Sequence, residues 1–194
     1  MADARAGRAQ RICHDLGLVG VSSALWIGAI YLNNEMLFPR AEEDEFDRWV
    51  FVPAGLRMLL VMLFGWRAAV GTALGSVPWM ADVLPGVGLA TISVSAGISG
   101  LMPWISVQLF SGATGVRHPW HDLVWWHLPA IAGLSAFANS AALNGQFLML
   151  GREPPRELPA NLLSMMIGDF LGALVLLLGL VAIVCLLRAG TTAR

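Results

Sequence analysis

Apolar runs alternate with polar segments along the whole chain, and most of the runs are long enough to be membrane helices. A helix that crosses the roughly 30 Å hydrocarbon core of a bilayer needs about 20 apolar residues. By this measure the sequence predicts an all-α polytopic transmembrane helix bundle of about six helices. The expected spans lie near 16–33, 50–64, 68–80, 85–110, 123–149 and 159–187.

Two of these spans are shorter than the others. Residues 50–64 and 68–80 are separated only by the turn Gly65-Trp66-Arg67. They are either two short helices or one broken element, and a hairpin that does not cross twice would reduce the count to five. Irregular backbone survives inside a membrane only where protein or a cavity shields it.

The first span is preceded by a basic segment, which is also how a signal peptide begins. Its apolar part continues to about Leu32 without a small-residue cleavage site. We therefore interpret it as a retained first transmembrane helix.

The composition also favours a membrane protein. The chain is 57% hydrophobic and 13% charged, whereas soluble domains average about 45–50% apolar and about 25% charged residues. Its 194 residues predict a single integral membrane domain over 1–194. A net charge of −1 without a basic, aromatic-rich cluster argues against a nucleic-acid partner.

The placement of arginine predicts the orientation, because short cytoplasmic loops carry an excess of basic residues. With a cytoplasmic N-terminus, seven arginines fall inside and four outside, and the C-terminus is cytoplasmic too. The inner set is Arg5, Arg8, Arg11, Arg67, Arg117, Arg188 and Arg194, and the outer set is Arg40, Arg48, Arg152 and Arg156. There is no lysine, a bias that we interpret as the composition of a GC-rich bacterial genome.

Small residues four apart mark the faces on which the helices should pack. Gly71 and Gly75 form one pair, Gly168 and Gly172 form another, and Gly100 lies on a face with small hydroxyl residues. Such patterns let helix backbones approach closely in a membrane. They predict that these helices pack on protein.

Two ionisable residues fall well inside predicted spans. Arg57 lies about seven residues from the outer end of its span and Asp169 about ten from the outer end of its own, or roughly 10 and 15 Å at 1.5 Å per residue. Charges at such depths usually pair or line a cavity. The amide of Asn139 lies near the same depth. These three residues are therefore either a structural ion pair with a hydrogen-bonded neighbour or a site for a small polar or anionic ligand.

The remaining polar residues predict neither a cofactor nor catalysis. The stretch "HPWHDLVWWH" holds His118, His121 and His127, but its tryptophans favour an aromatic belt at the membrane interface over a metal site. We expect no bound metal, no cofactor and no enzyme activity, because no nucleophile–base motif or phosphate loop is present. The acidic run 42–47 is interpreted as a solvated outer loop.

Two segments resemble a known family. The stretch from Phe51 to Val77, with its Gly-Trp-Arg turn, followed by "MMIGDFLGAL" around Asp169, resembles MASE1-type integral membrane sensory domains. The resemblance implies a bacterial inner-membrane input module. That family's members are usually fused to a signalling output domain, whereas this sequence ends soon after its last span. We therefore expect a non-enzymatic sensory or partner-binding module that acts through a separate membrane or signalling protein.

Two other functions stay open. Six helices in under 200 residues are similar to the substrate-binding subunits of energy-coupling-factor vitamin transporters. An accessory subunit of a larger respiratory or photosynthetic complex is the third alternative. In each case the lipid bilayer is an expected partner.

Overall fold

The computed structural model describes residues 2–37, 50–116, 120, 122–152 and 154–192, with side chains from 7 to 183 within those ranges. This part of the chain holds six α-helices and no strand, which confirms the all-α fold. The helices are α1 (Ala2–Tyr31), α2 (Val52–Phe64), α3 (Trp66–Val83), α4 (Leu89–Thr114), α5 (His127–Met149) and α6 (Leu158–Thr192), and a short π-helix, η1 (Leu32–Leu37), continues α1. The acidic run 42–47 lies outside the described residues.

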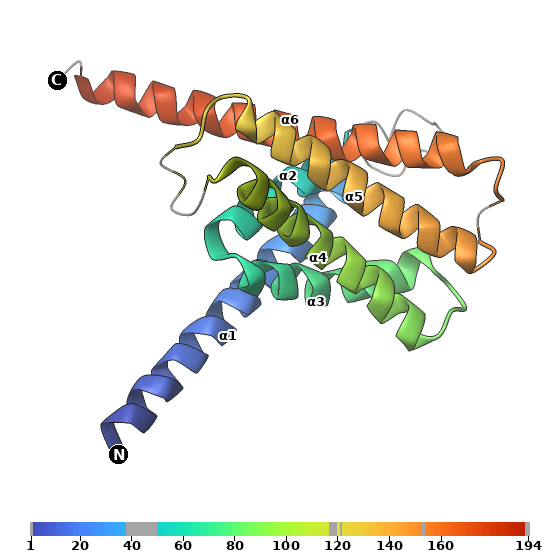
Figure 1. Ribbon diagram of the computed structural model, residues 1–194, viewed down its shortest axis with the longest axis horizontal. Coiled ribbons are helices and arrows are strands. Elements are labelled where there is room, and N and C mark those ends of the chain that lie inside the picture. Colours follow the sequence, from blue (N-terminus) through green and yellow to red (C-terminus); the bar gives the residue numbers. More distant parts are fainter. Residues whose placement is uncertain (1, 38–49, 117–119, 121, 153, 193–194) are drawn as a thin grey trace.

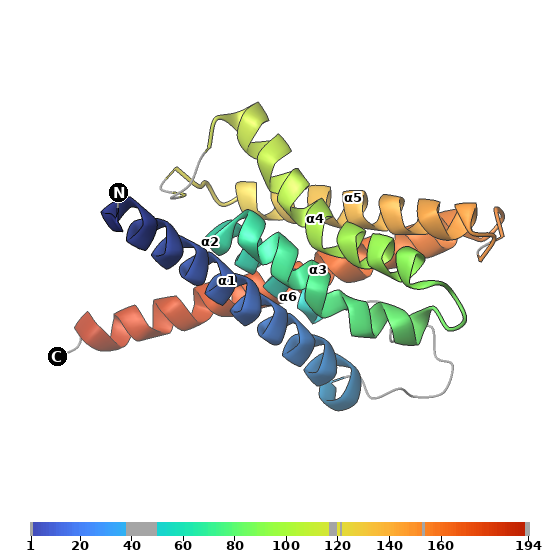
Figure 2. The ribbon, with the colours of Figure 1, turned by 90° about the horizontal axis from the view of Figure 1, so that it is seen from below.

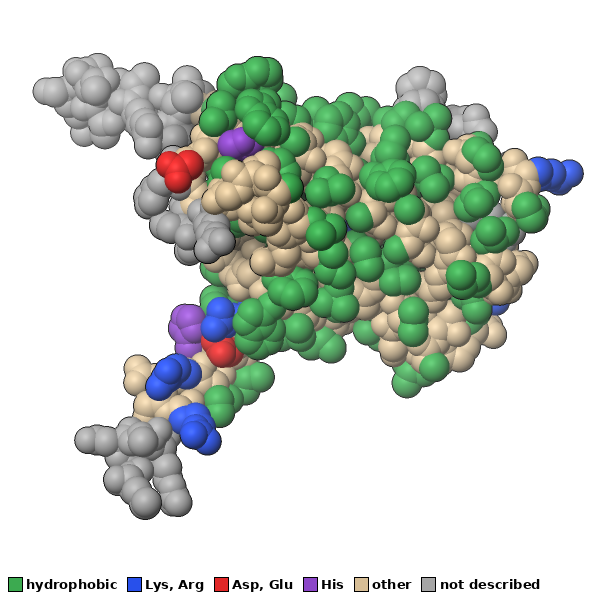
Figure 3. Space-filling model, in the orientation of Figure 1, with side chains coloured by type: hydrophobic (Ala, Val, Ile, Leu, Met, Phe, Trp, Pro, Cys, Tyr) green, Lys and Arg blue, Asp and Glu red, His purple; other side chains and the backbone are tan. Residues whose placement is uncertain are grey.

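Three helical segments are long and apolar enough to cross a membrane. They are Gly7–Leu37, Leu89–Thr114 and Leu158–Ile183, whereas Val52–Phe64 is apolar but shorter. Figure 3 shows a face covered largely by hydrophobic side chains, with the charged side chains confined to its two ends. That the chain crosses the membrane six times, and that both of its termini are cytoplasmic, stay predictions.

Glycine turns place the helix ends at two opposite ends of the bundle. Gly65, with a φ of 62°, reverses the chain between α2 and α3, and Gly115, with a φ of 76°, ends α4. The α3–α4 and α5–α6 connections lie at the other end (Figure 1), where Gly86 has a φ of 78°. We call these the Gly65 end and the Gly86 end.

The short helix α2 lies at the centre of the bundle and contacts every other helix. Helix α1 crosses the bundle obliquely against α3, and α4 and α5 lie between α3 and α6 (Figures 1 and 2). Most side chains of α2 are buried, among them Met58, Leu60 and Val61, which pack with Ile131 of α5. A helix of 13 residues is about 20 Å long, so its stability depends on this surrounding protein.

Glycines allow the helix backbones to touch. A Cβ on Gly71 would lie 2.5 Å from the Val19 carbonyl oxygen, and one on Gly75 would lie 2.9 Å from that of Ser23, so α1 and α3 meet backbone to backbone. A Cβ on Gly100 of α4 would overlap the Ala69 carbonyl oxygen of α3. These approaches are closer than any side chain permits.

The closest approach joins α6 to the start of α2. A Cβ on Gly172 would overlap the carbonyl group of Phe51. The Phe51 amide donates a hydrogen bond of 3.0 Å to the carbonyl of Gly168, which is buried. The backbone before α2 is therefore held directly against one turn of α6.

Replacement of Gly172 by Ala should destabilise the protein, because the new methyl group would overlap the Phe51 carbonyl. We expect a loss of about 1–3 kcal/mol, the usual cost of overpacking, measured as a lower midpoint of thermal unfolding in detergent. Gly179 of the same helix has open space where a Cβ would lie, with no atom within 4 Å, so Gly179→Ala is the matched control. Equal midpoints for the two variants would contradict the proposed backbone contact.

Candidate functional site

The structure brings Arg57 and Asp169 together at the centre of the bundle. Arg57 Nη2 of α2 donates to Asp169 Oδ2 of α6 across 3.1 Å. The two side chains are only 3% and 5% exposed. The ion pair is therefore shielded from solvent by protein, and it links two helices through residues that are 112 positions apart in sequence.

Asn139, the third residue predicted for this site, joins the same carboxylate. Its Nδ2 in α5 donates to Asp169 Oδ2 across 2.9 Å. Two donors thus converge on one carboxylate oxygen, and such charge-assisted bonds are among the stronger hydrogen bonds of proteins.

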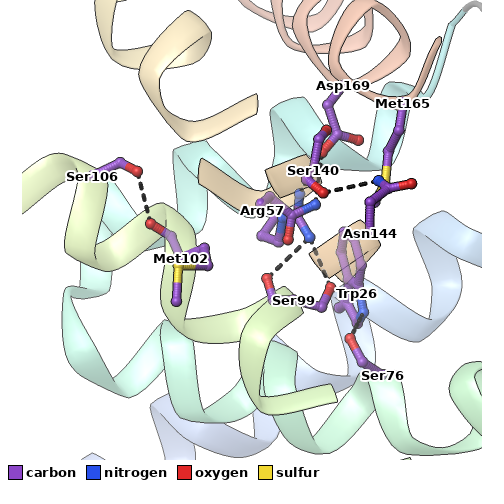
Figure 4. Close-up of polar contacts among 11 residues, drawn as sticks. Trp26, Arg57, Ser76, Ser99, Met102, Ser106, Ser140, Asn144, Met165 and Asp169 are labelled. Atoms are coloured by element: carbon purple, nitrogen blue, oxygen red, sulfur yellow. Dashed lines mark hydrogen bonds and ion pairs between the residues drawn. The ribbon is translucent and has the colours of Figure 1, made fainter. Parts of the chain in front are cut away.

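Two residues that were not predicted for the site complete the shell around Arg57. Arg57 Nη1 donates to the backbone carbonyl of Ser99 across 3.0 Å and to its Oγ across 2.7 Å. The Trp26 ring of α1 lies 5.2 Å from the Arg57 guanidinium carbon, in cation–π range. The Trp26 Nε1 in turn donates to Ser76 Oγ of α3 across 2.7 Å. Figure 4 shows how these side chains lie around Arg57.

We refer to Trp26, Arg57, Ser99, Asn139 and Asp169 as the Arg57 cluster. Its members come from α1, α2, α4, α5 and α6, and the Trp26–Ser76 bond extends it to α3. Trp26 lies in the middle of a span, and a buried indole N–H needs an acceptor, so this tryptophan is the sequence signal that could have pointed to a polar neighbourhood. The Ser99 carbonyl gives no such signal, because its role depends on which helix faces meet.

The cluster leaves little free space. A cavity of about 10 Å³ lies beside Arg57 and Asp169, lined also by Ser135 and by small residues of α5 and α6. That volume is about the space of one water molecule. Three buried polar atoms nearby, Arg57 Nε, Asn139 Oδ1 and Ser140 Oγ, have no hydrogen-bond partner among the described residues. In this conformation the cluster is closed around its own ion pair, and the geometry favours the structural alternative over an anion pocket.

Two further amide side chains of α5 make hydrogen bonds to residues outside the Arg57 cluster. Gln146 accepts a bond of 3.0 Å from Ser95 Oγ. Asn144 Nδ2 donates to the Ser140 carbonyl across 2.8 Å. The first bond joins α5 to α4, and the second stays within α5, while the same Asn144 Nδ2 also donates to Met165 Sδ of α6 across 3.5 Å.

The histidines are not gathered into a site within the described residues. His127 is buried, and its Nδ1 accepts from the Val124 amide across 3.0 Å while its ring packs against Trp126 and Phe110. His14 is exposed beside Asp15. His118 and His121 lie outside the described residues. No group of three metal-ligating side chains occurs in the part of the chain that the structure describes.

Comparison with known proteins identifies no family. No family model matches the chain, and no curated protein or solved structure matches it either. The resemblances to MASE1-type domains and to transporter subunits therefore stay predictions.

Breaking the ion pair should cost far more than removing a surface pair. We expect Asp169→Leu or Arg57→Met alone to destabilise the protein by about 3–5 kcal/mol, because each leaves an unpaired buried charge. The double variant, which removes both charges, should regain part of that loss. The measurement is equilibrium unfolding in detergent.

The exposed pair Arg156–Glu157 supplies the control. Its side chains are 85% and 51% exposed, so Arg156→Gln should change stability by less than about 1 kcal/mol. A loss in Asp169→Leu as small as in this control would contradict a stabilising role for the buried pair.

Proposed function

We propose that this chain is a multi-pass bacterial inner-membrane module without enzyme activity, which acts by binding a separate partner protein. The observation that carries the proposal is the course of α6. Within the bundle this helix is fastened to α2 by the Arg57–Asp169 pair and the Gly172 contact. Leu177 is the last of its described side chains to be buried, and the C-terminal part of the helix extends beyond the other helices (Figure 1).

The emerging part of α6 is exposed on all sides. Every residue from Leu178 to Ile183 is exposed, whereas Gly168, Asp169, Gly172, Ala173 and Leu177 are buried. A helix packed on its neighbours exposes residues on one face only, so six consecutive exposed positions mean that no other described helix accompanies α6 here. Leu178, Val181 and Ile183 make this part apolar, which suits a partner helix within the bilayer.

The closed Arg57 cluster supports the same proposal. A cavity of about 10 Å³ holds no metabolite. The cluster instead makes α6 one rigid body with the core, so a shift of the core would move the emerging part of α6 as well. This is the mechanical coupling that a sensory or regulatory module needs.

A photo-crosslinking amino acid at Leu178 or Val181 should capture one defined protein in native membranes, identified by mass spectrometry. Leu74 of α3, which is 57% exposed, is the matched control position on another helix. Asp169→Asn should lower the yield of the adduct, because it loosens α6 from the core. Adducts with lipid alone, or the same proteins captured from Leu74, would contradict the proposal.

The identity of the captured protein separates the candidate functions. A kinase or cyclase supports the MASE1-like sensory role, and an electron-transfer complex supports an accessory subunit. An ATP-binding cassette protein supports a substrate-binding transporter subunit. The observation that favours this second candidate is a groove between α1 and α3 that could hold a small molecule.

A further inference from the structure

The N-terminal part of α1 carries arginines that the bundle does not use. Every residue from Arg8 to His14 is exposed, and this part of the helix extends beyond the other helices (Figures 1 and 2). Arg11 Nε donates to the carbonyl of Gly7 in its own helix, across 3.3 Å. Arg8 makes no hydrogen bond or ion pair in the part of the chain that the structure describes. Neither side chain therefore holds α1 to another described helix.

These arginines continue the face by which α1 packs on α3. Ser22 and Trp26 are buried on that face, and the Trp26 indole bonds to α3. Asp15 lies seven residues before Ser22, and Arg8 lies seven before Asp15, so the three share one face. Arg11, four residues before Asp15, lies on it too. The packing face of α1 thus becomes a basic face beyond the start of α3.

Arg67, at the start of α3, joins this basic face. Its Nε donates to Asp15 Oδ1, and its guanidinium carbon lies 5.2 Å from the centre of the Trp66 ring. Its two terminal nitrogens have no hydrogen-bond partner among the described residues. We call Arg8, Arg11 and Arg67 the basic strip. Asp15 is the only acidic residue between positions 7 and 20, so positive charge dominates here, and Figure 3 shows basic side chains on the protruding part of α1.

The length of α1 places the basic strip at the membrane surface. The apolar segment Gly7–Leu37 has 31 residues, whereas the hydrocarbon core needs about 20. Positions 16–34 hold no charged residue, so they suit the hydrocarbon and most of the surplus falls before them. Asp15 and its partner Arg67 then lie at the boundary, and positions 8–11 lie among the headgroups. Trp66, which is 48% exposed, suits the same level, because tryptophan is enriched at membrane interfaces.

We infer that the basic strip binds the phosphate of an anionic phospholipid, whose acyl chains lie along exposed apolar side chains of α1. Guanidinium groups hold phosphate by charge-assisted hydrogen bonds, and arginines at a membrane surface attract anionic lipids. Ile12 and Leu16, which are 52% and 64% exposed, lie four residues apart beside the strip and supply the apolar contact. The inference does not rest on the proposed partner-binding function.

The charge and the position of the strip favour an anionic lipid over two related ligands. Phosphatidylcholine carries a cation, which three neighbouring arginines repel, whereas phosphatidylglycerol has a phosphate and no cation. A soluble phosphate ester has no acyl chains to lie against Ile12 and Leu16. An anionic lipid is the ligand that uses both the guanidinium groups and the apolar side chains next to them.

The test measures lipid binding to the whole chain in maltoside detergent by native mass spectrometry. The probes are phosphatidylglycerol and phosphatidylcholine with identical acyl chains, and glycerol 3-phosphate is the soluble comparison. We expect phosphatidylglycerol to bind about tenfold more tightly than phosphatidylcholine, with a preference that decreases as the ammonium acetate concentration rises. Equal affinities for the two lipids, or binding of glycerol 3-phosphate as tight as that of phosphatidylglycerol, would overturn the inference.

Paired substitutions locate the site. Arg8→Gln together with Arg11→Gln should reduce the preference for phosphatidylglycerol to about twofold or less. Both positions are exposed, and glutamine forms helix about as well as arginine, so a thermal unfolding scan should show an unchanged midpoint.

The matched control removes the same charge from the Gly86 end. Arg152 and Arg156 are exposed there, and replacing both by Gln should leave the preference at about tenfold. An unchanged preference in the α1 double variant, or an equal loss in this control, would refute the assignment to the basic strip.

Discussion

The structure depends on the need to satisfy one buried positive charge. Arg57 lies in a helix that contacts all the others, and its guanidinium is almost inaccessible to solvent. A charge in a medium of low polarity is costly unless donors and acceptors surround it. Asp169 neutralises it, Ser99 accepts two of its hydrogen bonds, and the Trp26 ring covers it. Each of these partners comes from a different helix, so the requirement of a single side chain fixes how four helices meet.

Close backbone contact is the second condition that makes this arrangement hold. Asp169 reaches Arg57 only because Gly172, one turn away, lets α6 lie against the backbone of Phe51. Glycines at 71, 75 and 100 do the same for α3 and its neighbours. Polar bonds and small residues therefore act together, as expected where lipid removes the hydrophobic difference between helix and surroundings.

Much of the ion-pair site could be predicted from the depth of residues along the spans and from helix periodicity. Which helices pair with which could hardly be predicted at all. Counting residues along two spans was enough to suggest Arg57 opposite Asp169, because rise per residue is nearly constant in a helix. The central place of α2 was not foreseen, since its short length indicated only a shielded element. Ser99 and Trp26 were missed as Arg57 partners for a related reason: which faces meet is decided by packing, which a single sequence does not encode in a local pattern. The face that carries Gly75 was expected to pack against another helix. The groove between α1 and α3 that Gly75 lines could not be predicted, because it depends on where these two helices cease to touch.

The separation of Arg57 from Asp169 in the sequence has a consequence for biosynthesis. Arg57 emerges from the ribosome 112 residues before its counter-charge is made. Until α6 arrives, α2 carries an unpaired arginine and the Phe51 amide lacks its Gly168 acceptor. The hairpin of α2 and α3 can therefore reach its final packing only after α6 has been made.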